Sequence, residues 1–143
     1  MGGAGQGSTS IWGTSSLYAV RISVAKLTGP MPDLAPPIYR QRLVVEGTCS
    51  KVIPEVAVSQ YLRELTTVCG MKRLMDPITH RSDRYGWAGW VHWENSGAHV
   101  YTWDSPMLFF SVDIYTCAAF EASDVVEFTA AFFDPDEIVA RSF

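Results

Sequence analysis

The sequence is poor in charged residues and in long apolar runs. Charged residues make up 18% of its 143 residues, the formal net charge is −4, and no stretch concentrates Lys and Arg. This balance argues against a nucleic acid or an anionic membrane surface as the main partner. Even the apolar run from Met107 to Val112 is ended by Asp113 and is too short to cross a bilayer. We therefore expect a soluble protein whose partner is a small molecule or another protein.

Cysteine is scarce, and no targeting signal is evident. The three cysteines, Cys49, Cys69 and Cys117, show neither a CxxC pair nor a spacing to His that is typical of zinc sites. We expect neither a disulfide framework nor a bound metal. The first ten residues, MGGAGQGSTS, lack the basic start and the apolar stretch of a secretory signal, which favours a cytoplasmic location. A flexible Gly/Ser-rich tail is expected over residues 1–16.

A hydrophobic fraction of 48% in a chain of this length fits one folded domain, which we expect over residues 17–143. Apolar residues at three- and four-residue spacing predict a helix over Glu55–Val68, and the capping-box pattern of Asp124 and Glu127 predicts the start of a second helix. Alternating or β-rich segments predict strands. The predicted strands are Leu17–Val24, Arg40–Thr48, Met71–Met75, Tyr85–Glu94, Ala98–Asp104, Leu108–Cys117 and Ile138–Ala140.

The order of these segments predicts an α+β domain, an antiparallel sheet with helices packed on one face. Turn residues at Asn95-Ser96-Gly97 and Ser105-Pro106 join the three aromatic strands into an antiparallel meander. The segment THRSDR, which contains His80, is expected to be a loop. The two turns of the meander are where we look for chemistry.

The stretch YGWAGWVHWENSGAHVYTWDSPMLFFSVDIYTC resembles the active-site core of the small bacterial and archaeal S-adenosylmethionine decarboxylases. That family has an aromatic-Gly-x-Ser-Gly strand, a Glu-Ser cleavage site, an HTWPE or HTYPE strand and a segment that ends in VDxFTCG. The resemblance is weaker over the rest of the chain from Arg40 onward, and it implies the family's sandwich fold. The matching stretches are Tyr85 to Gly89, Asn95-Ser96, Tyr101 to Asp104 and Val112 to Cys117.

The resemblance implies a lyase of polyamine biosynthesis that decarboxylates S-adenosylmethionine or a related amino acid. It implies autocatalytic cleavage before Ser96, which would become an N-terminal pyruvoyl group, the electron sink of the reaction. Cys117 matches the cysteine that the family uses as a proton donor. Glu94, Trp103 and Asp104 are candidate substrate contacts, and a homodimer is the implied assembly.

Several positions depart from the family pattern. Ala88 stands where the family has a serine that assists self-processing, and alanine has no hydroxyl to stabilise a transient oxyanion. Tyr101 stands where the family has a histidine base, and a phenol is a poor base at neutral pH. Asn95 replaces the glutamate before the cleaved bond, which matters less because Ser96 attacks a backbone carbonyl. His99 shares a strand face with Tyr101 and is the candidate replacement base.

Three functions therefore stay open. The first is a carboxy-lyase that works through a pyruvoyl group from Ser96. The second is an unprocessed paralogue that binds S-adenosylmethionine and catalyses a different lyase or cyclisation reaction, with Tyr101 or His99 as acid or base. The third is a non-catalytic regulatory subunit that pairs with an active homologue. Four tryptophans of this stretch could form a pocket for a sulfonium cation or pack against the helices or a partner subunit. They are Trp87, Trp90, Trp93 and Trp103.

Overall fold

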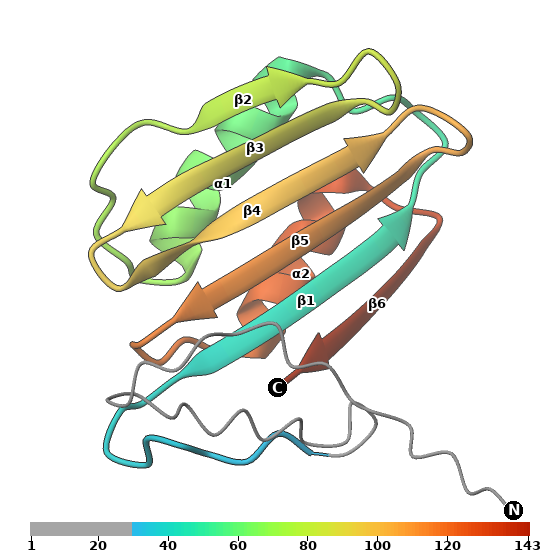
Figure 1. Ribbon diagram of the computed structural model, residues 1–143. Helices are drawn as coiled ribbons and strands as arrows, with labels where there is room; N and C mark the ends of the chain where they lie inside the picture. The colour runs from blue at the N-terminus through green and yellow to red at the C-terminus, as the bar shows by residue number, and fades with distance from the viewer. Residues whose placement is uncertain (1–29) are drawn as a thin grey trace, which may run out of the picture. The chain divides into compact units, whose positions relative to one another are not determined.

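The computed structural model describes residues 30–143, of which residues 35–143 form one compact unit (Figure 1). The expected tail over residues 1–16 and the expected strand at Leu17–Val24 lie outside the described residues. Within the described part, six strands form a single sheet and two helices accompany it. The strands are β1 Gln41–Thr48, β2 Ile78–Arg81, β3 Trp87–Trp93, β4 Ser96–Trp103, β5 Phe109–Thr116 and β6 Glu137–Ser142.

The sheet has the order β2-β3-β4-β5-β1-β6, and every neighbouring pair is antiparallel. The predicted meander is confirmed, because β3, β4 and β5 follow one another with Trp93 opposite Ser96 and Trp103 opposite Phe109. β1 continues the sheet on the other side of β5. The three strands that carry the aromatic motifs therefore have a neighbouring strand on each side.

Both helices, α1 (Glu55–Val68) and α2 (Ala122–Phe133), lie on the same face of the sheet, behind the strands in Figure 1. The predicted α+β architecture is confirmed. Along the four inner strands, β1, β3, β4 and β5, alternate residues face the helices and most of them are buried, as the pleat of a half-covered sheet requires. These residues form the core with the helices: Leu43, Val45, Val91, Trp93, Ala98, Val100, Phe110, Val112 and Ile114. No helix of residues 30–143 covers the opposite face, called the open face below.

The apolar spacing in α1 produces the buried side that it predicts. Val58, Tyr61, Leu62 and Leu65 are fully buried, and they lie three or four residues apart. The Tyr61 hydroxyl and the Thr129 hydroxyl of α2 are 2.8 Å apart and share a hydrogen bond. Burial raises the pKa of Tyr61, so this side chain remains a neutral hydroxyl that joins the two helices inside the core.

The predicted edge strand at Met71–Met75 is wrong in extent. Only an isolated bridge between Arg73 and Trp93 forms there, and the edge strand is instead β2, which includes His80 and was expected to be a loop. The Asp76-Pro77 pair interrupts the extended backbone, because proline has no N–H to donate to a ladder. The chain then resumes pairing with β3 where β-branched residues follow.

The second helix begins earlier than the capping box predicts. α2 starts at Ala122 with Glu121 in the N-cap position, and no side chain caps this end. Asp124 lies in the first turn, where a carboxylate interacts favourably with the positive end of the helix dipole. The local pattern therefore identified the helix but not its first residue.

Gly89 marks the closest approach of α1 to the sheet. A Cβ atom at this position would lie 2.6 Å from Val58 Cγ1 and 3.0 Å from Leu62 Cδ1. We predict that Gly89→Ala lowers the free energy of unfolding by roughly 1–3 kcal/mol, because the added methyl overpacks the contact with α1. Denaturant unfolding measures the change. His92→Ala, an exposed substitution on the same strand, is the control and should change stability by less than about 0.5 kcal/mol; equal effects would contradict the prediction.

Candidate functional site

The hairpin between β3 and β4 contains a strained residue. Trp93 and Ser96 are paired, so Glu94 and Asn95 form the tip of the hairpin. Ser96 has a φ of +116°, a backbone conformation that glycine adopts easily and residues with a Cβ rarely adopt. Within residues 30–143, the only other non-glycine residue with positive φ is Asp134. Backbone strain of this kind is often found at functional sites.

The carbonyl oxygen of Asn95 receives two donors from the end of β5. The Cys117 backbone N–H donates to it at 3.0 Å, and the Cys117 thiol approaches it at 3.6 Å. The structure therefore brings together Ser96 and Cys117, two residues that the sequence singled out. Two donors aimed at one carbonyl oxygen form the arrangement that stabilises negative charge when a nucleophile attacks the carbonyl carbon.

Ser96 also borders an open concavity on the sheet, with a volume of about 590 Å³. Its charged members are Arg42 and Asp113, whose side chains pair across β1 and β5. The predicted base His99 lies in the same concavity as Ser96. The residues that line it are Arg42, Trp90, Val91, His92, Ser96, Gly97, His99, Asp113 and Tyr115.

The Arg42–Asp113 pair is bidentate. Arg42 Nε donates to Asp113 Oδ1 at 3.0 Å, and Nη2 donates to Oδ2 at 2.6 Å. The hydrogen bond and the charge of Asp113 raise the pKa of Arg42. Each carboxylate oxygen keeps a free lone pair, and Asp113 lies directly opposite His99 in the sheet register. The pair therefore holds a fixed acceptor beside the histidine. Sequence reasoning missed Arg42 because the two partners are 71 residues apart.

Aromatic rings form a row along the open face of β4. His99 stacks on Trp90 of β3, with ring centroids 6.4 Å apart, and on Tyr101, with centroids 6.1 Å apart. The row continues from Tyr101 to Trp103 and then to Phe109 of β5. Trp90 is the only one of these residues besides His99 that also lines the concavity.

The four tryptophans do not share one pocket. Trp93 is fully buried on the helix side, where its indole N–H donates to Thr66 Oγ1 at 2.9 Å, and Trp87 packs against the same core. Trp90 and Trp103 lie on the open face instead. The alternation of side chains along β3 separates Trp90 from Trp87 and Trp93, so the single aromatic pocket is wrong.

The two altered family positions are neighbours. Ala88 of β3 lies directly opposite Tyr101 of β4. Tyr101 is five residues from Ser96 on the same strand, which corresponds to about 16 Å between their Cα atoms. Within one chain, the structure therefore groups Ser96 with Cys117 and Ala88 with Tyr101, and it does not bring the two groups together.

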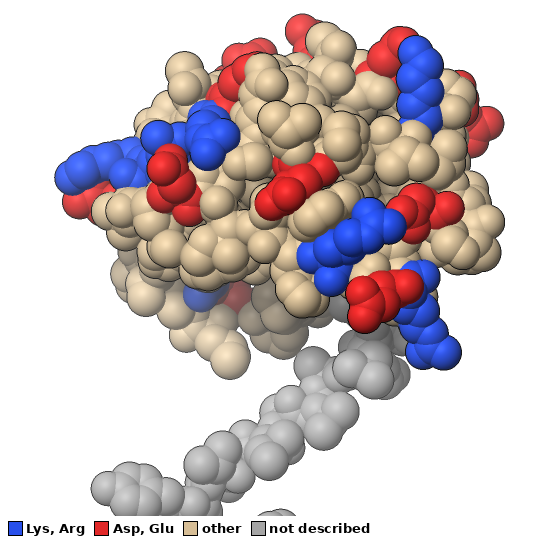
Figure 2. Space-filling model, turned by 90° about the horizontal axis from the view of Figure 1, so that it is seen from above, with Lys and Arg blue, Asp and Glu red and all other residues tan. Residues whose placement is uncertain are grey.

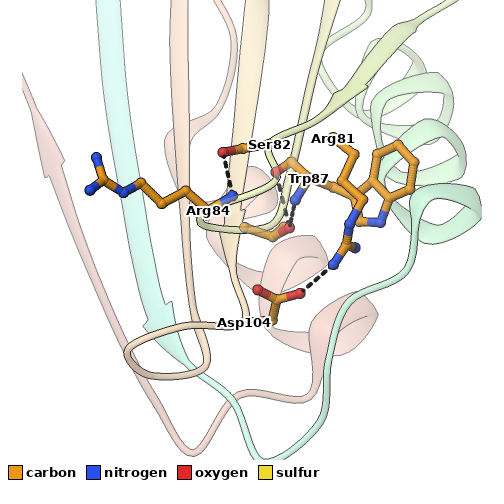
Figure 3. A network of polar contacts seen from close by, with 6 residues as sticks. Arg81, Ser82, Arg84, Trp87 and Asp104 are labelled. Atoms are coloured by element: carbon orange, nitrogen blue, oxygen red, sulfur yellow. Dashed lines mark hydrogen bonds and ion pairs between the residues drawn. The ribbon is translucent and has the colours of Figure 1, made fainter.

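The remaining predicted residues are also distributed along the strand. Trp103 and Asp104 are at the end of β4 that is remote from Ser96. The Asp104 carboxylate accepts from Arg81 Nη2 at 3.1 Å, and Figure 3 shows this pair beside Trp87. Glu94 is near Ser96, at the hairpin tip, and pairs with Lys72 at 3.4 Å.

Cys49 and Cys69 are buried in the core, as expected of structural thiols. Burial raises the pKa of the Cys69 thiol to about 12, and it raises the pKa of Cys49 with a smaller contribution from Asp136 and Asp134. Both therefore remain protonated. Cys117 is the exposed thiol among the three.

Neither the charges on the side of the molecule seen in Figure 2 nor the metal-ligating residue types within residues 30–143 indicate a second site. On the side of the molecule seen in Figure 2, Lys and Arg lie beside Asp and Glu, and neither sign forms a patch. Residues 30–143 contain no group of three or more His, Cys, Asp or Glu side chains arranged to hold a metal. None of the helices in the same residues is both long enough and apolar enough to span a bilayer.

Comparisons with known proteins bear on the fold and on the family of this chain. The chain is similar to the adenosylmethionine decarboxylase from Aquifex aeolicus, whose crystal structure superposes with a TM-score of 0.61 at 14% sequence identity. The match covers 74% of this chain and 89% of that one, and it shows a common fold. No curated protein sequence matches significantly. The sequence model of the family described as S-adenosylmethionine decarboxylase matches residues 47–143, so the chain belongs to the S-adenosylmethionine decarboxylase family.

Proposed function

We propose that this chain is an S-adenosylmethionine decarboxylase-like lyase with its site at the β3–β4 hairpin. The observation that carries the proposal is the Asn95 carbonyl, which accepts from the N–H and the thiol of Cys117. The Ser96 hydroxyl belongs to the next residue, so its oxygen can attack this carbonyl carbon. The two donors stabilise the negative charge that develops on the oxygen as the Asn95 acyl group moves from the Ser96 nitrogen, which takes the hydroxyl proton, to the Ser96 oxygen. Elimination of this ester breaks the Cβ–Oγ bond of Ser96 and releases the Asn95 carboxylate, which cleaves the chain. Water then replaces the nitrogen, which leaves as ammonia, and a pyruvoyl group remains.

The surroundings of Ser96 fit a pyruvoyl group made from it. Such a group supplies the electron sink that decarboxylation needs. Ser96 borders the concavity, where the Trp90 indole face suits a sulfonium cation and the Asp113 carboxylate, oriented by Arg42, suits a substrate amine. The Cys117 thiol, next to the cleavage bond, is the proposed proton donor. S-adenosylmethionine or a related amino acid is the proposed substrate.

One observation favours a second candidate function. His99 lines the same concavity as Ser96 and lies opposite the fixed carboxylate of Asp113. An imidazole beside a carboxylate is a suitable acid or base near neutral pH. An unprocessed chain with this arrangement would bind S-adenosylmethionine without a covalent bond and catalyse a different lyase or cyclisation reaction.

A homodimer is part of the proposal. Tyr101 is too far along β4 to contact Ser96 of its own chain, and the open face carries the exposed rings of both Tyr101 and Tyr115. A second copy packed on this face in the opposite direction would bring Tyr101 and Ala88 of one chain near Ser96 of the other. The two pairs of motif residues would then meet across the dimer.

The departures at Ala88 and Tyr101 can be tested by reversing them. We predict that Ala88→Ser with Tyr101→His accelerates pyruvoyl-forming cleavage before Ser96 by roughly tenfold or more, because a hydroxyl donor and an imidazole base return. Intact-mass spectrometry of the denatured protein measures the fragments and the blocked C-terminal chain. Adding Ser96→Ala should abolish this product. A double variant that stays intact would show that another position prevents processing.

Binding measurements test which end of the open face holds the substrate. We predict that Trp90→Ala weakens the binding of S-adenosylmethionine by about 0.5–2 kcal/mol, roughly 2- to 30-fold in Kd, because the indole contact with the sulfonium is lost. Isothermal titration calorimetry measures the change. Trp103→Ala, on the same face at the remote end, is the matched comparison and should weaken binding less than Trp90→Ala, because Trp103 does not line the concavity that Ser96 borders. A larger effect at Trp103 would move the site toward Asp104, and no binding by the wild-type chain would contradict the proposed substrate.

The strain at Ser96 predicts a stability difference. A residue with a Cβ in the left-handed region costs roughly 1–2 kcal/mol, whereas glycine is more flexible in the unfolded chain by about 0.5–1 kcal/mol. The middle of these ranges makes Ser96→Gly more stable than Ser96→Ala by roughly 0.5–1 kcal/mol, measured by thermal unfolding of uncleaved protein. An alanine variant as stable as the glycine variant would show that the hairpin is not strained at this residue.

A further inference from the structure

The polarised carbonyl of Asn95 has a second nucleophile within reach. Asparagine carries an amide nitrogen that can attack the carbonyl carbon of its own residue and close a five-membered ring. We propose that Asn95 cleaves the chain by this cyclisation, which releases residues 96–143 with an unmodified serine at their start. This inference concerns a modification of the chain and does not depend on the substrate or on the pyruvoyl chemistry proposed above.

The electrophile is the same carbonyl that Cys117 holds. Its oxygen accepts from the Cys117 N–H at 3.0 Å and faces the thiol at 3.6 Å. Attack on the carbon moves electron density onto this oxygen, so donors already in place lower the barrier without further rearrangement. The fold provides this assistance to any nucleophile that reaches the carbon, whichever side chain carries it.

The nucleophile is close and unrestrained. Asn95 is half-buried at the hairpin tip, and within residues 30–143 no hydrogen bond holds its side-chain amide. Rotation about two side-chain bonds is sufficient to bring Nδ2 over its own carbonyl carbon. Because both reacting atoms belong to one residue, the entropy cost of bringing them together is small.

The leaving group gains from the reaction. Ser96 is held at a φ of +116°, and breaking the bond between Asn95 and Ser96 frees its backbone to leave this strained conformation. The serine nitrogen needs a proton when it departs. His92 and His99 both line the concavity that Ser96 borders, so an imidazole is available to carry the proton from the amide of Asn95 to the leaving amine.

The reaction is balanced without a co-reactant. The Nδ2–C bond forms as the C–N bond to Ser96 breaks, and one proton passes from Nδ2 to the serine nitrogen. No oxidant, reductant or water is consumed. The N-terminal fragment ends in a succinimide ring at Asn95, which water opens in a later step. A molecule cleaved in this way can no longer form a pyruvoyl group, because its serine is already released intact.

The cleaved protein should remain assembled. The cut separates β1, α1, β2 and β3 from β4, β5, α2 and β6, but β3 pairs with β4 and β1 pairs with β5 across the two fragments. The sheet therefore holds the fragments together in solution. Only a denaturing measurement will detect the break.

The test compares full-length wild type with Ser96→Ala and Asn95→Gln during long incubation near neutral pH. Intact-mass spectrometry after denaturation follows the fragments. We expect wild type and Ser96→Ala to yield a residue 1–95 fragment that is one water lighter than the free acid, with an unmodified serine or alanine starting the other fragment. Cleavage of Asn95→Gln should be slower by roughly tenfold or more, because its longer side chain must close a six-membered ring.

Three controls keep the result specific. Asn95→Gln must melt at the wild-type temperature, and Asn95→Asp, which lacks the nucleophilic nitrogen, is a second variant should glutamine disturb the hairpin. Cys117→Ala keeps the backbone donor but removes the thiol, and it should slow the reaction.

Several results would overturn the proposal. They are an intact wild-type chain, an intact Ser96→Ala chain, unchanged cleavage in Asn95→Gln, or deamidation of Asn95 without chain cleavage. A C-terminal fragment that is blocked and absent in Ser96→Ala would instead support the pyruvoyl route alone, so the two proposals fail independently.

Discussion

The hydrogen bond from the Cys117 N–H to the Asn95 carbonyl is the constraint on which the candidate site depends. It closes the pairing of β4 with β5 at the hairpin end, where Ser96 lies opposite Thr116. The side chains on a strand alternate between faces, so a shift of this register by one residue would put His99 and Asp113 on opposite faces of the sheet. The same bond that polarises the carbonyl thus keeps the concavity on the open face.

Short-range patterns were sufficient for most of the fold. The apolar spacing of α1 and the turn residues of the meander are local signals, and both predictions are confirmed. β2 was missed because an edge strand has few buried residues to reveal it, and all four of its residues are at least partly exposed. The start of α2 was misplaced because a carboxylate in the first turn stabilises a helix almost as well as one at the cap.

The candidate site was less predictable than the fold, since it depends on contacts between distant segments. The resemblance identified Ser96 and Cys117, and the structure brings them together. It did not indicate Arg42, which reaches the site only through the pairing of β1 with β5. It also grouped Ser96 with Tyr101, although an extended strand carries these two residues far apart. Residues that are close in the sequence of a motif can lie far apart in space when the motif forms an extended strand.

The contacts at Asn95 give a physical reason why the proposed cleavage does not require the side chains that the family pattern has at positions 88 and 101. The donor from β5 and the strained turn are properties of the backbone, and they persist whatever residues stand at Ala88 and Tyr101. The side chains then decide only which nucleophile attacks and where the proton goes. In this chain a serine oxygen and an asparagine nitrogen flank the same carbonyl carbon, so under the two proposals the ratio of their rates determines which of the two cleavage products forms.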